Sequence, residues 1–161
     1  MHKNQTTKIK TKSNRLCFES ERLSLQKQTQ ETIDSLKKAV ELNPDNSTAL
    51  CLLGGVLNEQ SNPDCVSYYE KSLEKNKNCY LAYRGLGNFY LKNQQFDKSE
   101  KNYTRAIEIN DNRFGPIYKN RGYVRQQQNK MNEAKEDYQS YIKFTPNAKD
   151  RGMIERALNE M

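Results

Sequence analysis

The side chains that most often carry out chemistry are few in this chain and poorly placed for it. They are one histidine, His2, and four cysteines, Cys17, Cys51, Cys65 and Cys79. The cysteines are 34, 14 and 14 positions apart with no C-x-x-C pair, so they lack the ligand spacing of a zinc site. In a helical chain such thiols are expected to be reduced, small and buried. The sequence therefore predicts no metal and no cofactor.

A catalytic site is not expected either. One histidine near the N-terminus cannot pair with a serine or cysteine nucleophile, and no glycine-rich phosphate loop follows a strand pattern. The adjacent carboxylates Glu136 and Asp137 should point apart on a helix surface and be solvated. The chain is predicted not to be an enzyme.

The composition favours solvated helices around a narrow core. Of the 161 residues, 34% are hydrophobic and 29% are charged with mixed signs, while the chain holds 7 glycines and 4 prolines. These proportions are typical of elongated helical arrays and exclude a large apolar core. No apolar run reaches the ~20 residues of a membrane span, and the N-terminus lacks the apolar region of a secretory signal. A cytoplasmic location is expected.

Positive charge is concentrated at the N-terminus. The formal net charge is +7, and residues 1–18 contribute five cations with no acidic residue, namely Lys3, Lys8, Lys10, Lys12 and Arg15. Residues 1–15 are therefore predicted to form a basic flexible tail on a nearly neutral domain. A solubilising tail is the favoured interpretation, and an organellar import sequence is the alternative.

A period of 35 residues organises the rest of the chain. Tyr83 and Tyr103 recur as Tyr118 and Tyr138, each 35 positions later, and Gly87 recurs as Gly122. An earlier copy holds Leu50, Gly54 and Tyr69 with a shorter inter-helix loop, and a partial copy precedes it. Apolar residues within each copy lie at helical spacing, which predicts two amphipathic helices per repeat.

This pattern resembles the tetratricopeptide repeat, a helix–turn–helix unit of about 34 residues. The resemblance implies an all-α fold, a right-handed superhelix (α-solenoid) of antiparallel helix pairs with three to four repeats and a C-terminal capping helix. The expected segments are a degenerate N-terminal repeat at 16–46, repeats at 47–79, 80–113 and 115–148 within 47–148, and a capping helix at 149–161.

Helix boundaries are predicted from capping residues and from proline. Asn62-Pro63-Asp64, Gly115-Pro116 and Thr145-Pro146 are each expected to open a helix. The expected helices lie near 29–43, 47–60, 63–76, 80–93, 96–110, 115–128, 130–144 and 147–160, and a further helix is expected near 14–26. In the last predicted helix, Ile154, Ala157, Leu158 and Met161 should face the core.

Glycine is expected where two helices of a pair cross. Gly54, Gly87 and Gly122 lack side chains at positions that would allow Tyr69, Tyr103 and Tyr138 to approach closely. One repeat departs from the apolar pattern, because Arg121 and Arg125 replace leucine or tyrosine. The aliphatic stem of Arg125 is expected to pack while its guanidinium reaches water.

The family resemblance places ligands on the first helix of each pair. Its exposed stripe predicts a peptide-binding face made of Arg84, Asn88, Lys92, Lys119, Asn120, Tyr123 and Gln127. Amides can bond a peptide backbone and cations attract carboxylates, so an extended acidic or C-terminal peptide is expected. The corresponding stripe of the earlier repeat is Thr48, Cys51, Gly55 and Asn58.

The expected partner is another protein, and the expected role is that of an adaptor or scaffold, free or as a subunit of a larger assembly. A carboxylate clamp for chaperone tails would lack its third element, because Asp150 and Ile154 or Lys149 and Met153 stand where two cations are needed. The alternative function is binding of single-stranded RNA through the basic tail and groove.

Overall fold

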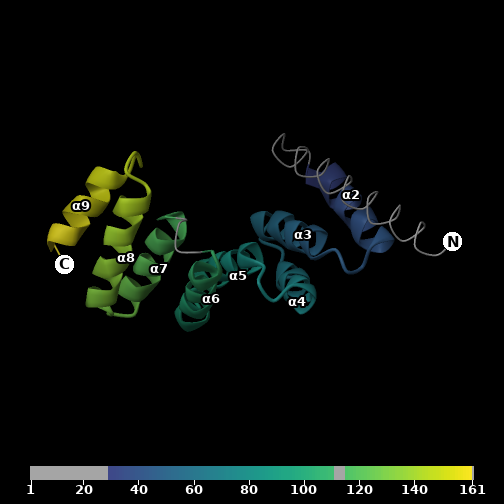
Figure 1. Cartoon of the computed structure of the whole chain (residues 1–161), viewed down its shortest axis with the longest axis horizontal. Coiled ribbons are helices and arrows are strands. Elements are labelled where there is room, and N and C mark those ends of the chain that lie inside the picture. The colour runs from purple at the N-terminus through teal and green to yellow at the C-terminus, as the bar shows by residue number, and fades with distance from the viewer. Residues whose placement is uncertain (1–28, 111–114, 161) are drawn as a thin grey trace. The chain divides into compact units, whose positions relative to one another are not determined.

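The computed structural model describes residues 29–110 and 115–160, which form eight α-helices and no strand (Figure 1). In chain order the helices are α2 (Thr29–Leu42), α3 (Ser47–Glu59), α4 (Cys65–Lys75), α5 (Tyr80–Lys92), α6 (Phe96–Ile109), α7 (Gly115–Gln127), α8 (Met131–Phe144) and α9 (Arg151–Glu160). The all-α prediction is confirmed, and the first seven of these helices match their predicted ranges within about two residues. The basic tail and the helix expected near 14–26 lie outside the described residues.

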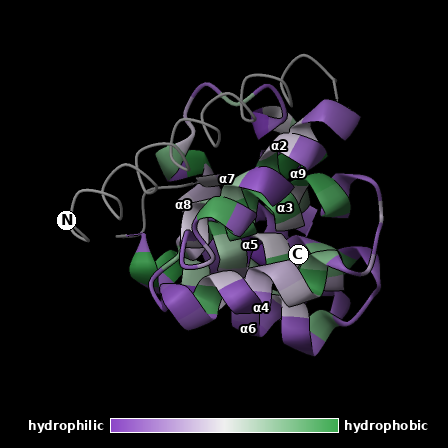
Figure 2. Ribbon diagram, turned by 90° about the vertical axis from the view of Figure 1, so that its right-hand side faces the viewer, coloured by the Kyte–Doolittle hydropathy of each residue, from purple (hydrophilic) through white to green (hydrophobic). Residues whose placement is uncertain are grey.

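The chain divides into two compact units, Met1–Gly85 and Leu86–Met161, with the boundary inside α5. Unit 1 contains α2, α3, α4 and the start of α5, whereas unit 2 contains the end of α5 and α6 to α9. Both units are built from amphipathic helices that carry hydrophobic and hydrophilic residues on different sides (Figure 2). No helix in the described ranges is long and apolar enough to cross a membrane.

Unit 1 is packed around the ring of Tyr69 on α4. A Cβ atom added to Gly54 on α3 would lie 2.9 Å from this ring, and one added to Gly85 on α5 would overlap it outright. Tyr69 is buried, so its ring occupies the space that both glycines leave. The contact with Gly54 was predicted, but the contact with Gly85 was not.

Unit 2 repeats the same contact twice. A Cβ on Gly87 would lie 2.6 Å from the ring of Tyr103, and a Cβ on Gly122 would lie 3.1 Å from the ring of Tyr138. In the first of these crossings the Ser99 hydroxyl also donates to the Gly87 carbonyl at 2.9 Å. The predicted pairing of glycine with tyrosine at each helix crossing is therefore confirmed in all three repeats.

The turn between the two helices of each repeat has one recurring backbone form. Ser61, Gln94 and Asn129 each adopt a positive φ, between 55° and 60°. The residue after each of them donates its N–H to a carbonyl five positions earlier at 2.9 Å, as Asn62 does to Leu57. This is the bonding of a Schellman C-cap, which is built here without the usual glycine.

The last helix begins later than expected. Thr145-Pro146 was predicted to open it, but residues 146–150 form turns and α9 starts at Arg151. Two successive turns, in which Ala148 donates to Thr145 and Arg151 donates to Ala148, take up the chain before the helix. Ile154, Ala157 and Leu158, which were predicted to face the core, are half-buried. No residue of α9 is fully buried. Met161 lies outside the described residues.

Candidate peptide-binding surface

The predicted binding residues do not all belong to one unit. Arg84 lies in unit 1, whereas the other six lie in unit 2, on the end of α5 and on α7: Asn88, Lys92, Lys119, Asn120, Tyr123 and Gln127. In unit 2 the two helices are joined directly, because the Asn120 amide donates to the Asn88 side-chain oxygen at 3.4 Å. The candidate surface is defined here as these six residues of unit 2.

Asn88 is held in a fixed orientation. Its side-chain oxygen accepts a hydrogen bond from the Tyr103 hydroxyl at 2.7 Å in addition to the bond from Asn120. The buried tyrosine that fills the space beside Gly87 therefore also positions an amide of the candidate surface. Such prior fixing lowers the entropy lost when a ligand binds.

Lys119 already holds a carboxylate. Its ammonium lies 2.8 Å from a carboxylate oxygen of Asp150, and the Tyr141 hydroxyl donates to the other oxygen of that group. The hydrogen bond to Asp150 raises the pKa of Lys119, and the hydrogen bond from Lys119 lowers the pKa of Asp150. This part of the surface has the chemistry of a carboxylate site, but a ligand has to compete with Asp150 for it.

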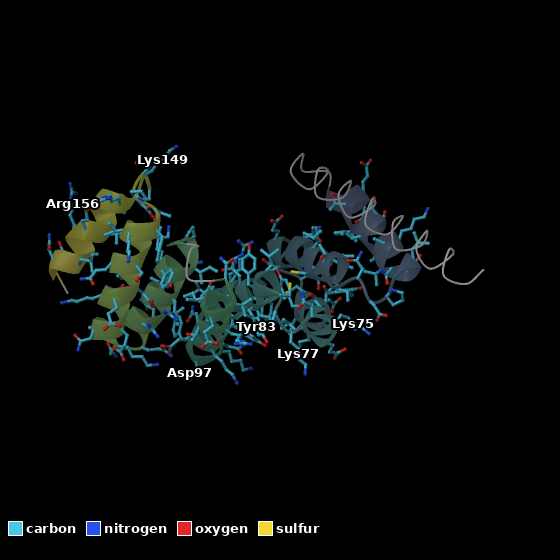
Figure 3. All side chains as sticks on the ribbon, in the orientation of Figure 1. Lys75, Lys77, Tyr83, Asp97, Lys149 and Arg156 are labelled. Atoms are coloured by element: carbon cyan, nitrogen blue, oxygen red, sulfur yellow. The ribbon has the colours of Figure 1, made fainter. Side chains whose placement is uncertain are left out.

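Three residues of the surface are exposed. Tyr123 is 46% exposed, the largest value for a tyrosine in the described residues. Lys92, at the end of α5, and Gln127, at the end of α7, are also exposed. An exposed tyrosine offers a flat apolar contact and a hydroxyl, a combination common at protein interfaces. Lys149 and Arg156 project from the end of the chain around α9 (Figure 3) and are not part of this surface.

Arg84 interacts with other groups in unit 1. It is half-buried, and its positive charge opposes the increases in pKa that Cys51 and Tyr69 undergo. For Cys51 the largest cause of that increase is a hydrogen bond with Cys79, and for Tyr69 it is burial. The guanidinium therefore lies near these two side chains.

The stripe predicted for the earlier repeat is wrong at two positions. Cys51 and Asn58 were placed on the exposed stripe of α3, but they are 6% exposed each, so for Cys51 the expectation of a buried thiol is the correct one. Asn58 donates to the carbonyl of Gly85 at 3.3 Å, so the start of α5 covers this side of α3. The sequence pattern of one helix cannot show which of its polar residues the next repeat covers.

A buried ionic network in unit 2 was also missed. Asp137 on α8 was expected to be solvated, but it is 2% exposed and accepts hydrogen bonds from two arginines of α7. Arg121 approaches it at 2.6 Å and Arg125 at 3.0 Å, and Arg121 also donates to Thr104 at 3.1 Å. The guanidinium of Arg125 therefore forms buried ion pairs and does not reach for water, contrary to the prediction.

The network extends to α6 through Glu100. This carboxylate accepts from Arg125 at 2.9 Å and from Lys130 at 2.6 Å. Burial raises the pKa of Glu100, but the hydrogen bonds from Lys130 and Arg125 outweigh it and leave the pKa below its usual value. Two arginines at positions that are apolar in the other repeats were the signal in the sequence for acidic partners on the neighbouring helices.

Residues 82–113 and 116–147 match the model of the tetratricopeptide repeat family. Anaphase-promoting complex subunit 3 of Schizosaccharomyces pombe is 31% identical over 98 residues, which are 60% of this chain and 15% of that protein. The chain thus spans only a small part of the length of this relative.

Solved structures show the same fold at low sequence identity. A crystal structure of MamA has a TM-score of 0.73 and 18% identity, covering 92% of this chain and 85% of that one. A structure of pilF from Pseudomonas aeruginosa has a TM-score of 0.84 and 17% identity, covering 94% and 69%. A MamA fragment from Desulfovibrio magneticus RS-1 has a TM-score of 0.71 and 16% identity, covering 85% and 77%.

Proposed function

The chain carries tetratricopeptide repeats, and from this premise we propose that it is a protein-interaction scaffold whose α5–α7 surface binds an extended acidic segment of a partner protein. The repeat match and the similarity to a subunit of the anaphase-promoting complex support the role of a scaffold within a larger assembly. The observation that carries the acidic specificity is the binding of the Asp150 carboxylate by Lys119 and Tyr141.

The side chains of the surface divide the recognition between them. Asn120 and Gln127 can bond the backbone of an extended peptide, and Tyr123 offers a flat contact for its side chains. The cation of Lys92 attracts its carboxylates, and Lys119 can exchange Asp150 for a carboxylate of the partner. Because the exchange replaces one carboxylate by another, it gains specificity more than affinity.

The proposal is tested by affinity capture from native lysate followed by mass spectrometry, comparing the wild-type chain with the double variant Asn120→Ala/Tyr123→Ala. Acidic segments of the proteins captured only by the wild type are then synthesised as labelled peptides. Their binding to the chain is measured by fluorescence anisotropy. Loss of a neutral hydrogen bond costs about 0.5 to 1.5 kcal/mol, and loss of the Tyr123 contact adds to it, so the double variant should bind about tenfold more weakly. Helical circular dichroism should be unchanged.

Lys135→Ala on α8 is the matched control and should bind like the wild type, because the second helix of the pair is not part of the surface. Equal binding by wild type and double variant would contradict the proposal. The RNA alternative predicts a different result: binding to single-stranded RNA that falls steeply with salt and is lost on deletion of residues 1–15.

A further inference from the structure

We propose that Asp150 is an internal competitor for the partner's carboxylate, and that its displacement frees its side chain to cap the start of α9. This inference rests on the proposed function, because it concerns the same carboxylate site at Lys119. It adds a second ligand-binding residue, Tyr141, and a conformational consequence of binding. The site lies in unit 2, where residues of α7 and α8 approach the residue before α9 (Figure 1).

The site is built for one carboxylate. The Lys119 ammonium lies 2.8 Å from one oxygen of Asp150, and the Tyr141 hydroxyl donates to the other oxygen. The ammonium also lies over the Tyr141 ring, 5.2 Å from its centre, so the ring helps to hold the cation in place. Because Tyr141 is 4% exposed, its hydroxyl needs an acceptor from the group that occupies the site. One carboxylate is therefore exchanged for another, and the site is not left empty.

The bound carboxylate can be reached from solvent. The side chains of Lys119 and Asp150 are 37% and 32% exposed, so a second carboxylate can approach the ammonium while Asp150 is still bound. Asp150 belongs to the same chain and therefore competes at a high effective concentration. An isolated anion cannot overcome this competition, whereas a segment that also contacts Asn120 and Tyr123 can. Asp150 thus acts as an autoinhibitory contact that selects extended acidic ligands.

The backbone around Asp150 is fixed, so the exchange needs only a movement of its side chain. The hydroxyl and the N–H of Thr145 both donate to the Tyr141 carbonyl. A Cβ added to Gly115 of α7 would lie 2.6 Å from the methyl group of Thr145, which shows how closely the start of the segment is packed. At its other end, the Asp150 carbonyl accepts from the N–H of Ile154 at 3.1 Å.

A displaced Asp150 side chain has a second acceptor role. Asp150 is the residue before α9, and aspartate is preferred at this position because its side chain accepts from an N–H two or three residues further on. Those N–H groups belong to Gly152 and Met153. The N–H of Met153 donates to the Asp150 carbonyl at 3.0 Å, whereas that of Gly152 has no acceptor among the described residues. Capping of Gly152 also places the carboxylate at the positive end of the helix dipole, which offsets part of the loss of Lys119.

The experiment is a titration of the ¹⁵N-labelled 161-residue chain followed by NMR, which measures weak binding residue by residue. One probe is a hexapeptide of alternating glycine and aspartate with an amidated C-terminus. The other probe has asparagine in place of aspartate and a free C-terminal carboxylate. The probe that binds more tightly shows whether a side-chain or a terminal carboxylate enters the site.

Asp150→Asn is the main variant, because it keeps the shape of the side chain and removes the competing charge. It should bind the tighter probe about tenfold more strongly than the wild type does, since the internal competitor is gone. In Asp150→Asn/Tyr141→Phe this gain should be lost, because the carboxylate of the probe loses one of its two donors. Circular dichroism checks that each variant is folded.

Glu160→Gln is the matched control. It removes one negative charge from an exposed residue of α9 outside the site, so it should bind the probe like the wild type. If Glu160→Gln gained as much affinity as Asp150→Asn, the gain would come from net charge and the internal competition would be overturned.

The cap is tested by the exchange of amide protons with water. When the probe saturates the wild type, the Gly152 amide should exchange more slowly, because it then donates to the Asp150 carboxylate. Unchanged exchange at Gly152 in the saturated protein would overturn the capping step.

Two further outcomes separate this inference from the proposed function. If the probe shifts the signals of the candidate surface and binds wild type and Asp150→Asn equally well, the internal competition is wrong and the proposed function stands. If neither probe shifts those signals in either protein, both are contradicted.

Discussion

The α3–α4 pair of unit 1 and the α7–α8 pair of unit 2 share a backbone but differ in their interior. Both pairs have a glycine on the first helix against a tyrosine on the second, and both turn through a residue with positive φ. At equivalent positions of the first helix, however, α3 buries Leu53 and Leu57 where α7 has Arg121 and Arg125. The crossing and the turn therefore define the repeat, while the residues beside them can be apolar or ionic.

The comparison is tested most severely at Asp137. Replacing it with Ala leaves Arg121 and Arg125, which are 11% and 16% exposed, without their shared carboxylate, and breaking a largely buried pair costs about 3 to 5 kcal/mol. Urea unfolding should show this loss of stability. Glu136→Ala, an exposed neighbour on the same helix, should change stability by less than about 0.5 kcal/mol. If both variants lose the same small amount, the network contributes no more than a solvated charge.

The shared crossing is tested by overpacking it in both pairs. Gly54→Leu and Gly122→Leu each place atoms where a tyrosine ring lies, at a cost of roughly 1 to 3 kcal/mol. Thermal unfolding should show a lower midpoint for both. Gly152→Ala on α9 is the control, since a Cβ there would meet nothing within 4 Å, and it should not lower the midpoint.

In the shared turn, in contrast, a substitution by glycine should raise the stability of the fold. Glycine adopts a positive φ without strain, so Ser61→Gly should raise the free energy of unfolding by about 0.5 to 1 kcal/mol. Asn129→Gly should gain less, because asparagine tolerates this conformation better than serine. The measurement is chemical denaturation. If one substitution raised the free energy of unfolding and the other lowered it, the two turns would not be equivalent.

The smallest expected effect concerns the contact of Asp150 with Lys119 and Tyr141, which belongs to unit 2. The pKa of Asp150 is lowered by Lys119 and Tyr141, so the stabilisation is present above the usual pKa of an aspartate and is lost as the pH falls through the lower folded value. Ion pairs near the surface contribute about 0.2 to 1 kcal/mol. Hydrogen exchange of α9 should therefore quicken, relative to the intrinsic rate, as the pH falls below the usual pKa of an aspartate, about 4. In Asp150→Asn this relative protection should not change over the same range.

The sequence predicted what is local and periodic. Helix positions, the glycine–tyrosine crossings and the burial of Cys65 all follow from residue types repeated at a fixed spacing. It did not predict contacts that depend on a residue of another repeat. Asn58 is covered by α5, and Arg125 is paired with Glu100 on α6, so neither environment is visible in the pattern of one helix. The delayed start of α9 likewise depends on turns after Pro146 and not on a capping pattern.

The bond between Arg125 and Glu100 has a consequence for how the repeats of unit 2 depend on each other. Arg125 belongs to the α7–α8 pair, whereas Glu100 lies on α6 of the preceding pair, and Lys130 adds a second link between them. In a linear array, stability is the sum of terms within repeats and terms between neighbours. Part of the stability of α7–α8 therefore comes from the term between neighbours, and the pair is not an interchangeable module. Moving it behind a repeat without an acid at the position of Glu100 would weaken the cooperativity of unfolding.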